Sequence, residues 1–431
     1  MITAIIIFFF LGYLCIALES VIKINKAVPA LLMCVVCWTI YSMGAEGVDT
    51  SSRLLHHLGE TCEILFFLMG AMTIVEIVDA NGGFYFVHDA LATKSKRTLL
   101  WRITAMTFFL SAILDNLTTS IVMIMVLRKL VADNHDRMLY GGMIIIAANA
   151  GGAFSPIGDV TTIMLWIKGM ISTGGVISHL IVPSIMSVVI SAVLISFSLK
   201  GELTAPQIEE DKVSLRNSRH RNIILAVGVG GLIFVPIFRI LTGLPPFMGI
   251  LLALGVLWLV SEHYCNRNMM LCETTHLKVT TLLSRIDMAT ILFFLGILLA
   301  VATLQETAVL STFGQWLNDV SNGNHYLVTG IIGIVSSIVD NVPLVAGCMD
   351  MYPIATSGDF AIDGLFWQLL AYCAGVGGSM LIIGSAAGVV VMGLEKISFG
   401  WYLRRFSWIA LIGYLSGILI YALEVNFIFS A

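Results

Sequence analysis

The chain is built from long apolar runs separated by short polar segments, and ten of the runs approach the length of a membrane-spanning helix. An α-helix needs about 20 apolar residues to cross the hydrocarbon core of a bilayer. The runs cover residues 2–18, 27–44, 62–80, 139–168, 176–199, 222–241, 246–260, 286–304, 366–394 and 401–423. This pattern predicts an all-α polytopic membrane protein.

Two further apolar stretches, 99–131 and 326–352, carry the pairs Asp115-Asn116 and Asp340-Asn341 at their centres. Each arm has roughly 11 to 16 residues, or about 17–24 Å of helix, which is short for a core near 30 Å thick. We therefore expect two re-entrant hairpins whose tips stop inside the membrane. Asp and Asn are also good helix N-caps, so each pair could simply start a helix. The two roles are compatible, and a carboxylate at lipid depth in both stretches favours function.

The two hairpins belong to a duplication that covers the whole chain, with matching positions about 226 residues apart. Residues 63–68 align with 290–295, and five crossings separate the two segments. Because five is odd, the halves should have opposite orientations in the membrane. We predict two inverted repeats, each with five transmembrane helices, one of them broken, plus a hairpin. The first covers 1–199 and the second 222–431, joined by a cytoplasmic linker at 200–221; secondary transporters often have this architecture.

Charge placement gives the orientation, because Lys and Arg mark cytoplasmic loops. Basic residues flank the first hairpin: Lys94, Lys96, Arg97, Arg102, Arg128, Lys129 and Arg137. No Lys or Arg occurs between Arg285 and Lys396, a segment that contains the second hairpin. The first hairpin should therefore open from the cytoplasm and the second from outside, with both termini external.

Composition agrees with a membrane protein, since 58% of the 431 residues are hydrophobic and 12% are charged. The net charge of −4 is small, and the charged residues are distributed by sign among the loops, which argues against a nucleic-acid partner. Membrane lipid is the expected surrounding. The first run, 2–18, has neither a basic n-region nor a small-residue cleavage site, so we expect a retained helix rather than a signal peptide.

Two of the predicted crossings are interrupted by glycine and proline. The run 139–168 contains Gly151, Gly152, Pro156 and Gly158, and the run 366–394 contains Gly375, Gly377, Gly378 and Gly384. A broken helix exposes main-chain amides and carbonyls together with two helix-dipole ends, and membranes tolerate it only where it lines a cavity or meets protein. Close helix packing also uses glycine, but packing alone does not require Pro156 or Asp159.

Four polar elements should then converge: the tips Asp115-Asn116 and Asp340-Asn341, and the breaks at Asn149 to Asp159 and Gly377 to Ser385. Burial and like charge raise the pKa of a carboxylate, whereas a bound cation lowers it, so a proton and a cation can displace one another there. Oxygen ligands from Asp, Asn, Thr and main-chain carbonyls suit a hard ion. In the repeat alignment Asp159 corresponds to Ser385, so the first half should hold more of the ion-binding oxygen. Each single Thr or Ser hydroxyl could instead bond main chain.

Further acidic residues and several histidines lie near the third run. Glu60, Glu63, Glu76 and Asp79 lie in or at this run, and we favour a structural role for Glu63 and Glu76. His56, His57 and His88 fall at loop or helix-end positions. Histidine titrates near physiological pH, although an exposed histidine is usually only solvated.

At these polar residues the sequence resembles the NhaD-type sodium/proton antiporters of the ion transporter superfamily. The segments that carry the resemblance are 114–120, 149–162, 339–345 and 384–388, and the match covers nearly the full chain. One departure is Ile382, which is apolar where some members are expected to carry a hydroxyl. The resemblance implies exchange of Na⁺ or Li⁺ for H⁺ across a bacterial inner membrane, a homodimer, and a hairpin-bearing transport domain that moves against a scaffold. With the two hairpin tips, it points to these candidate positions: Asp115, Asn116, Asn149, Asp159, Thr161, Thr162, Ser336, Asp340, Asn341 and Ser379.

We therefore predict a cation/proton antiporter, and neither an enzyme nor a cofactor-dependent protein. Asp115 and Asp159 would alternately bind protons and Na⁺, with Thr161 among the direct metal ligands and Asn116, Asn149 and Thr162 completing the shell. Asp340 and Asn341 would balance charge or supply a second proton site. No Gly-x4-Gly-Lys-Ser/Thr loop occurs, so the proton gradient is the expected energy source.

Three alternatives remain open from the residues. Another carrier of the same superfamily could export arsenite or import an anion with Na⁺, although acidic tips disfavour an anion. An intramembrane aspartyl protease also uses paired aspartates, but its Gly-x-Gly-Asp motif is absent around Asp115 and Asp340. A channel would not need two broken helices, though it could contain them.

Overall fold

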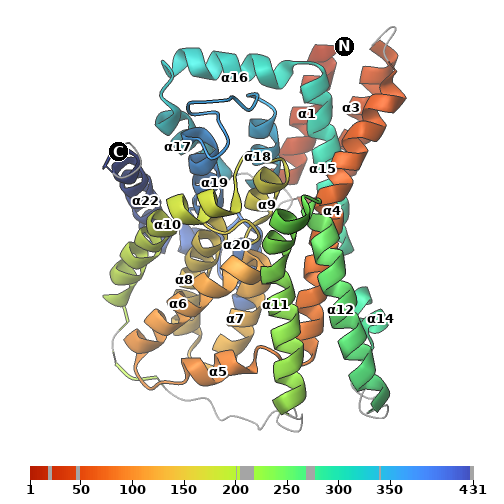
Figure 1. The fold of residues 1–431 in the computed structure, drawn as a ribbon. Coiled ribbons are helices and arrows are strands. Elements are labelled where there is room, and N and C mark those ends of the chain that lie inside the picture. Colours follow the sequence, from red (N-terminus) through yellow and green to blue (C-terminus); the bar gives the residue numbers. More distant parts are fainter. Residues whose placement is uncertain are drawn as a thin grey trace.

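The computed structural model describes residues 1–17, 22–44, 49–199, 201–203, 218–267, 277–338 and 341–427. These residues form helices and contain no strand (Figure 1). The helices of the first half are α1 (Ile2–Ala17), α3 (Ala27–Gly44), α4 (Thr50–Ala80), α5 (Tyr85–Leu91), α6 (Lys96–Leu114), α7 (Asn116–Leu130), α8 (Asn134–Ala153), α9 (Val160–Ile167) and α10 (Thr173–Ser196). Those of the second half are α11 (Ser218–Thr242), α12 (Pro246–Arg267), α14 (Val279–Leu282), the 3-10 helix η2 (Leu283–Arg285), α15 (Met288–Glu306), α16 (Val309–Val320), α17 (His325–Ser336), α18 (Asn341–Met349), α19 (Leu365–Gly377), α20 (Ala386–Glu395), α21 (Phe399–Arg405) and α22 (Ser407–Phe427).

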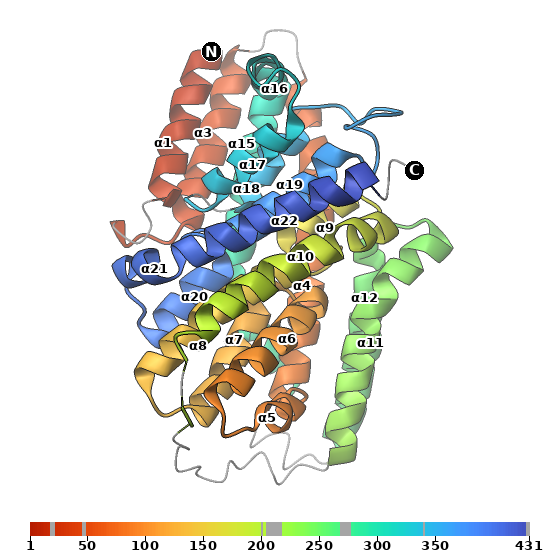
Figure 2. The same cartoon turned by 90° about the vertical axis from the view of Figure 1, so that its left-hand side faces the viewer.

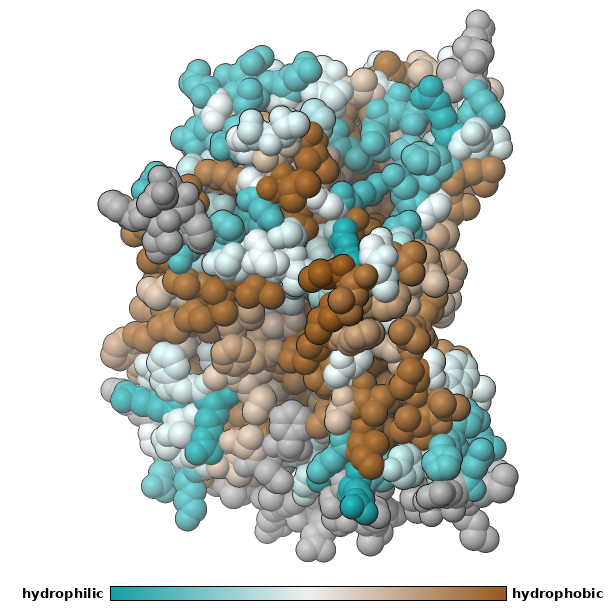
Figure 3. Space-filling view, viewed as in Figure 1, coloured by the Kyte–Doolittle hydropathy of each residue, from teal (hydrophilic) through white to brown (hydrophobic). Residues whose placement is uncertain are grey.

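Eight helices in the described part of the chain are long and apolar enough to cross a membrane: α3, α4, α6, α10, α11, α12, α15 and α22. The prediction of an all-α polytopic membrane protein is confirmed. Figure 3 shows apolar side chains across the middle of one face and polar ones toward its two ends, as expected for a protein surrounded by lipid.

Both interrupted crossings are broken where glycine and proline indicated. The first consists of α8 and α9 with a break between Ala153 and Val160, and the second of α19 and α20 with a break between Gly377 and Ala386. Each pair leaves a helix C-terminus and a helix N-terminus in the interior of the protein.

The two hairpins differ in length. The second has arms of 12 and 9 residues, α17 and α18, of which the first is as short as expected and the second is shorter. In the first, α7 has 15 residues but α6 has 19, so the prediction of a short first arm was wrong. The helix begins before the apolar stretch because the side chain of Ser95 caps it, accepting a hydrogen bond from the amide of Thr98. Asp340, at the second tip, lies outside the described residues.

Three further features were not predicted. Two short helices, α5 and α16, lie in segments too polar to form a long apolar run. The last predicted crossing is divided at Phe406 into α21 and α22. We use α16 and α5 to name the two sides of the molecule: α4 begins on the α16 side and ends on the α5 side (Figure 1).

The helices form two groups that lie side by side in Figure 1. The scaffold group comprises α1, α3, α4, α11, α12 and α15, with α3 packed on α15 and α12 on α4. The core group comprises α6 to α10, α17 to α20 and α22, with α6 packed on α8 and α17 on α19. In Figure 2, α10 and α22 lie side by side and run diagonally over the core group. The inverted relation between the two halves stays a prediction.

Candidate functional site

The carboxylate of Asp159 lies at the centre of the polar residues in the core group. Asp159 follows the first break in extended conformation, caps the N-terminus of α9 and is only 1% exposed. Its Oδ1 accepts hydrogen bonds from the amide and the hydroxyl of Thr161 at 2.9 and 3.0 Å. Its Oδ2 accepts from the side-chain amide of Asn116 at 2.7 Å. The side-chain nitrogen of Asn341 lies 3.5 Å from both carboxylate oxygens. Both hairpin tips therefore reach the first break.

The side chain of Asn149 connects the two halves. Its Oδ1 accepts a hydrogen bond from Asn116 at 3.0 Å, and its Nδ2 donates to Ser379 at 3.1 Å and to Ser385 at 2.9 Å. Asn149 and Ser379 have no exposed surface, and Ser385 is 2% exposed. The four polar elements that the sequence pointed to are thus in direct contact, apart from the undescribed Asp340.

Glycine allows the helices around this site to approach closely. A Cβ at Gly151 of α8 would lie 2.2 Å from the main-chain oxygen of Phe108 in α6. At the corresponding contact in the second half, a Cβ at Gly377 would lie 2.3 Å from the oxygen of Gly333. Neither position accepts a larger residue without separating two main chains. The glycines that predicted the breaks therefore also hold the hairpins against the broken helices.

Asp115 has a more local set of contacts than Asp159. Its carboxylate caps α7, accepting hydrogen bonds from the amide and the hydroxyl of Thr118 at 2.7 and 2.9 Å. The N-cap role considered for this residue is therefore present. Its φ of 111° is unusual for a residue with a side chain, and such conformations are held by their surroundings. The carboxylate remains half-buried at the turn between α6 and α7.

Two predicted hydroxyl groups bond main chain. Thr162 donates to the carbonyl oxygen of Asp159 at 2.8 Å, and Ser336 donates to the carbonyl oxygen of Ala374 at 2.9 Å. Ser111 makes the same contact as Ser336 in the other half, donating to Ala148 at 2.6 Å. These two serines therefore join each hairpin to the broken helix of the same half by a hydrogen bond.

The candidate positions drawn from the sequence omitted two residues that make direct contacts here. Ser385 caps α20, accepting from the amide of Gly388, and also accepts from Asn149. Its alignment with Asp159 in the repeat could have identified it from the sequence. Thr118 donates its hydrogen bonds to Asp115. Its position three residues after Asp115, in the first turn of α7, could have identified it from the sequence.

A cavity of about 440 Å³ opens beside the site on the α5 side. Its lining includes Ser385 and Leu117 at the site, and Lys26 and Asp287 at the ends of scaffold helices. This cavity gives the site an approach from the α5 side.

Two broken helices and two polar tips, enclosed by membrane helices, define the protein as a multi-pass membrane transporter. The chain belongs to the citrate transporter (CitMHS) family, whose match covers residues 13–370. The resemblance to NhaD antiporters is confirmed by the relatives described next.

The chain is similar to proteins named as sodium/proton antiporters. It is 47% identical to Sodium/proton antiporter 1 of Arabidopsis thaliana, over 97% of this chain and 72% of that protein. It is 45% identical to Sodium/proton antiporter 2 of the same plant, over 97% and 99%. It is 28% identical to the Na⁺/H⁺ antiporter NhaD of Vibrio cholerae, over 97% and 91%. These names describe transporters, in agreement with the prediction that the protein is not an enzyme.

The fold also resembles a solved transporter structure. The YdaH transporter of Alcanivorax borkumensis superposes with a TM-score of 0.57 at 11% identity, over 94% of this chain and 99% of that one. At this identity the likeness shows the fold alone.

Proposed function

We propose that the protein exchanges Na⁺, or Li⁺, for H⁺, and that the two ions compete at the buried carboxylate of Asp159 and the half-buried carboxylate of Asp115. One observation carries the proposal: the carboxylate of Asp159 is 1% exposed and accepts hydrogen bonds from the neutral side chains of Asn116 and Thr161. The segments around it, 103–127, 138–167 and 286–395, contain no Lys or Arg. A carboxylate in such surroundings is stabilised by a proton or by a metal cation.

The ligand shell follows from the side chains around this carboxylate. Asn116 and Asn149 offer their carbonyl oxygens to a cation when their side-chain amides rotate, and Thr161 offers its hydroxyl oxygen. Thr162, Ser336 and Ser379 hold these groups in place. Asp340 and Asn341 balance the charge or supply a second proton site.

Further parts of the proposal concern the cycle and the assembly. Two carboxylates that titrate in one cycle would move more protons than sodium ions, which makes exchange electrogenic. We also propose an inverted repeat, external termini, a homodimer and a location in the bacterial inner membrane. The Arabidopsis relatives share more identity than the Vibrio protein, so a plant membrane is the alternative location.

A second candidate is transport of an anion, because the matching family is described as a citrate transporter. A citrate carrier has to balance the charge of several carboxylates, and Arg and Lys side chains are the usual partners for such groups. The absence of Lys and Arg from the three sequence segments above favours a cation as the substrate.

The experiment follows a ΔpH-sensitive dye in everted vesicles from an antiporter-deficient host. Na⁺, Li⁺, K⁺ and citrate are added in turn to the wild type and to Asp159→Asn. We expect Na⁺ or Li⁺ to collapse the proton gradient in the wild type and not in the variant.

The control is Asp319→Asn, which removes an exposed carboxylate on α16 and should behave as the wild type. A gradient that responds to citrate but to no alkali cation, in protein shown to be inserted, would overturn the proposal.

A further inference from the structure

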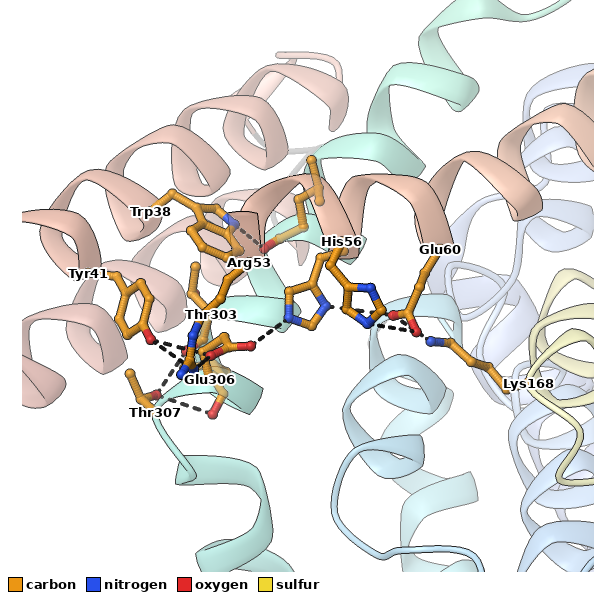
Figure 4. A network of polar contacts seen from close by, with 12 residues as sticks. Trp38, Tyr41, Arg53, His56, Glu60, Lys168, Thr303, Glu306 and Thr307 are labelled. Carbon is orange, nitrogen blue, oxygen red and sulfur yellow. Dashed lines mark hydrogen bonds and ion pairs between the residues drawn. The ribbon is translucent and has the colours of Figure 1, made fainter. Parts of the chain in front are cut away.

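On the α16 side, two scaffold helices hold the end of α9. Lys168 follows the last residue of α9, and its Nζ lies 2.7 Å from the carboxylate of Glu60 in α4 (Figure 4). Arg239 of α11 donates to the main-chain oxygen of Trp166 in the last turn of α9, and its guanidinium lies 4.8 Å from the centre of the Trp166 ring. The core group is therefore fastened to the scaffold group on this side.

Glu60 also belongs to a chain of polar contacts between α4 and α15. His57 lies one turn earlier in α4, with Nδ1 3.7 Å from Glu60 and Nε2 2.9 Å from Glu306 at the end of α15. Glu306 also forms an ion pair with Arg53 and accepts from Tyr41 at 3.3 Å (Figure 4).

The space beside Glu60 is small. A cavity of about 40 Å³ is lined by His57, Glu60 and Lys168 together with Asp350, which follows α18. This volume holds only a few water molecules and is much smaller than the cavity of about 440 Å³ on the α5 side.

The repeat alignment locates the matching contact on the α5 side. Glu63 aligns with Thr290, so Glu60 aligns with Asp287, the residue that caps the N-terminus of α15. The helix that corresponds to α9 is α20, and it too is followed by a lysine, Lys396. Each half thus has an acidic residue on a scaffold helix and a lysine directly after its inner half-helix.

The second pair is apart in this structure. Within the described residues Lys396 and Asp287 form no ion pair with each other. The cavity of about 440 Å³ lies between their helices, lined by Asp287 on one side and by Met392 and Gly393 of α20 on the other. The ion pair that is formed adjoins the small cavity, and Asp287 of the pair that is apart adjoins the large one.

We propose that Glu60–Lys168 and Asp287–Lys396 are two alternating latches between the scaffold group and the core group. The first closes the α16 side in the present conformation. The second forms, and the first breaks, when the site faces the α16 side. Alternation keeps the site from opening to both sides, which would let protons leak without exchange. This inference rests on the proposed function and on the inverted repeat.

The test measures how fast a cysteine in the open cavity reacts, because that rate reports the conformation without any transport. Val389→Cys places the thiol on α20, where the native side chain lines the cavity and is 41% exposed. A membrane-impermeant maleimide is added to everted vesicles, which expose the α5 side in the predicted orientation, and labelling is compared with that of the protein lacking Val389→Cys.

Breaking the first latch should lower the labelling rate, whereas breaking the second should raise it or leave it unchanged. In Glu60→Gln we expect the rate to fall by roughly twofold to fivefold, the shift that a partly exposed ion pair supports. In Lys396→Gln the labelling rate should rise or stay at the wild-type value, because the contact that it removes forms only in the other conformation. The reversed pair Glu60→Lys with Lys168→Glu should restore the wild-type rate, and Glu262→Gln, which removes an exposed carboxylate of α12, should leave it unchanged.

An unchanged rate in Glu60→Gln, or the same decrease in Lys396→Gln, would overturn the latches. Failure of the proposed function is separate from this outcome. If the vesicles show no Na⁺-dependent change in ΔpH, the proposed ion exchange is wrong. A labelling rate that falls in Glu60→Gln and does not fall in Lys396→Gln would still support the latches.

Discussion

The substitution Asn149→Ala tests whether one side chain joins the two halves of the protein. Asn149 is completely buried, accepts one hydrogen bond from Asn116 and donates one each to Ser379 and Ser385. Alanine removes all three contacts at a position that has no exposed surface. Asn116 keeps its second acceptor, Asp159, at 2.7 Å.

The magnitude follows from these contacts. Each lost hydrogen bond costs about 1 kcal/mol, and a buried polar group left without a partner costs about 1–3 kcal/mol. The two serine hydroxyls can turn toward other acceptors, which reduces the loss. We expect the free energy of unfolding to fall by about 3 kcal/mol, together with loss of Na⁺-driven exchange because the two breaks are no longer aligned.

The assay is an SDS titration of purified protein in mixed micelles, with the folded fraction as the readout. The matched control is Asn266→Ala, which removes an exposed side-chain amide at the end of α12 and should change stability by less than about 0.5 kcal/mol. If Asn149→Ala unfolds at the same SDS fraction as this control, the side chain does not join the halves and the reasoning is refuted.

Three further predictions use the same titration and the vesicle assay. Gly151→Ala should destabilise the protein by about 1–3 kcal/mol, because the added Cβ would meet the main chain of α6. The control Gly174→Ala adds a Cβ with no atom within 4 Å and should leave stability unchanged, so equal unfolding curves for the two variants would contradict the prediction. Glu395→Gln should cost about 2–4 kcal/mol, since a carboxylate that is 3% exposed then no longer pairs with two arginines, and a wild-type curve would contradict it. Asp115→Asn should keep the cap of α7 and the stability but lose Na⁺-driven dequenching; exchange at the wild-type rate would exclude Asp115 as an ion ligand.

Long apolar runs predicted most of the fold because a helix surrounded by lipid must be apolar over its whole length. The start of α6 at Lys96 could not be read from that signal, since it depends on a cap by Ser95 outside the apolar stretch. Helix α16 was not predicted for a similar reason. Polar and apolar residues are interspersed in it, and it lies across the top of the molecule in Figure 1 instead of crossing the membrane.

The central polar residues were predictable because Asn116, Asn149 and Asp159 are costly at lipid depth unless they meet one another. Their individual contacts were not. Which hydroxyl reaches Asn149, and whether Asp115 bonds its own turn or Asp159, depends on how closely α6 and α8 approach. The ion pair of Glu60 with Lys168 joins residues far apart in the chain, so only the packing of the two groups reveals it.

The most direct test of the account is whether Na⁺ displaces a proton from Asp159. Purified protein in weakly buffered detergent solution is mixed with NaCl or choline chloride, and a pH indicator records the protons released. We expect Na⁺, but not choline, to release protons from the wild type, and Asp159→Asn to release fewer. Equal release from both proteins, or none from the wild type while it binds Na⁺, would contradict competition of the two ions at this carboxylate.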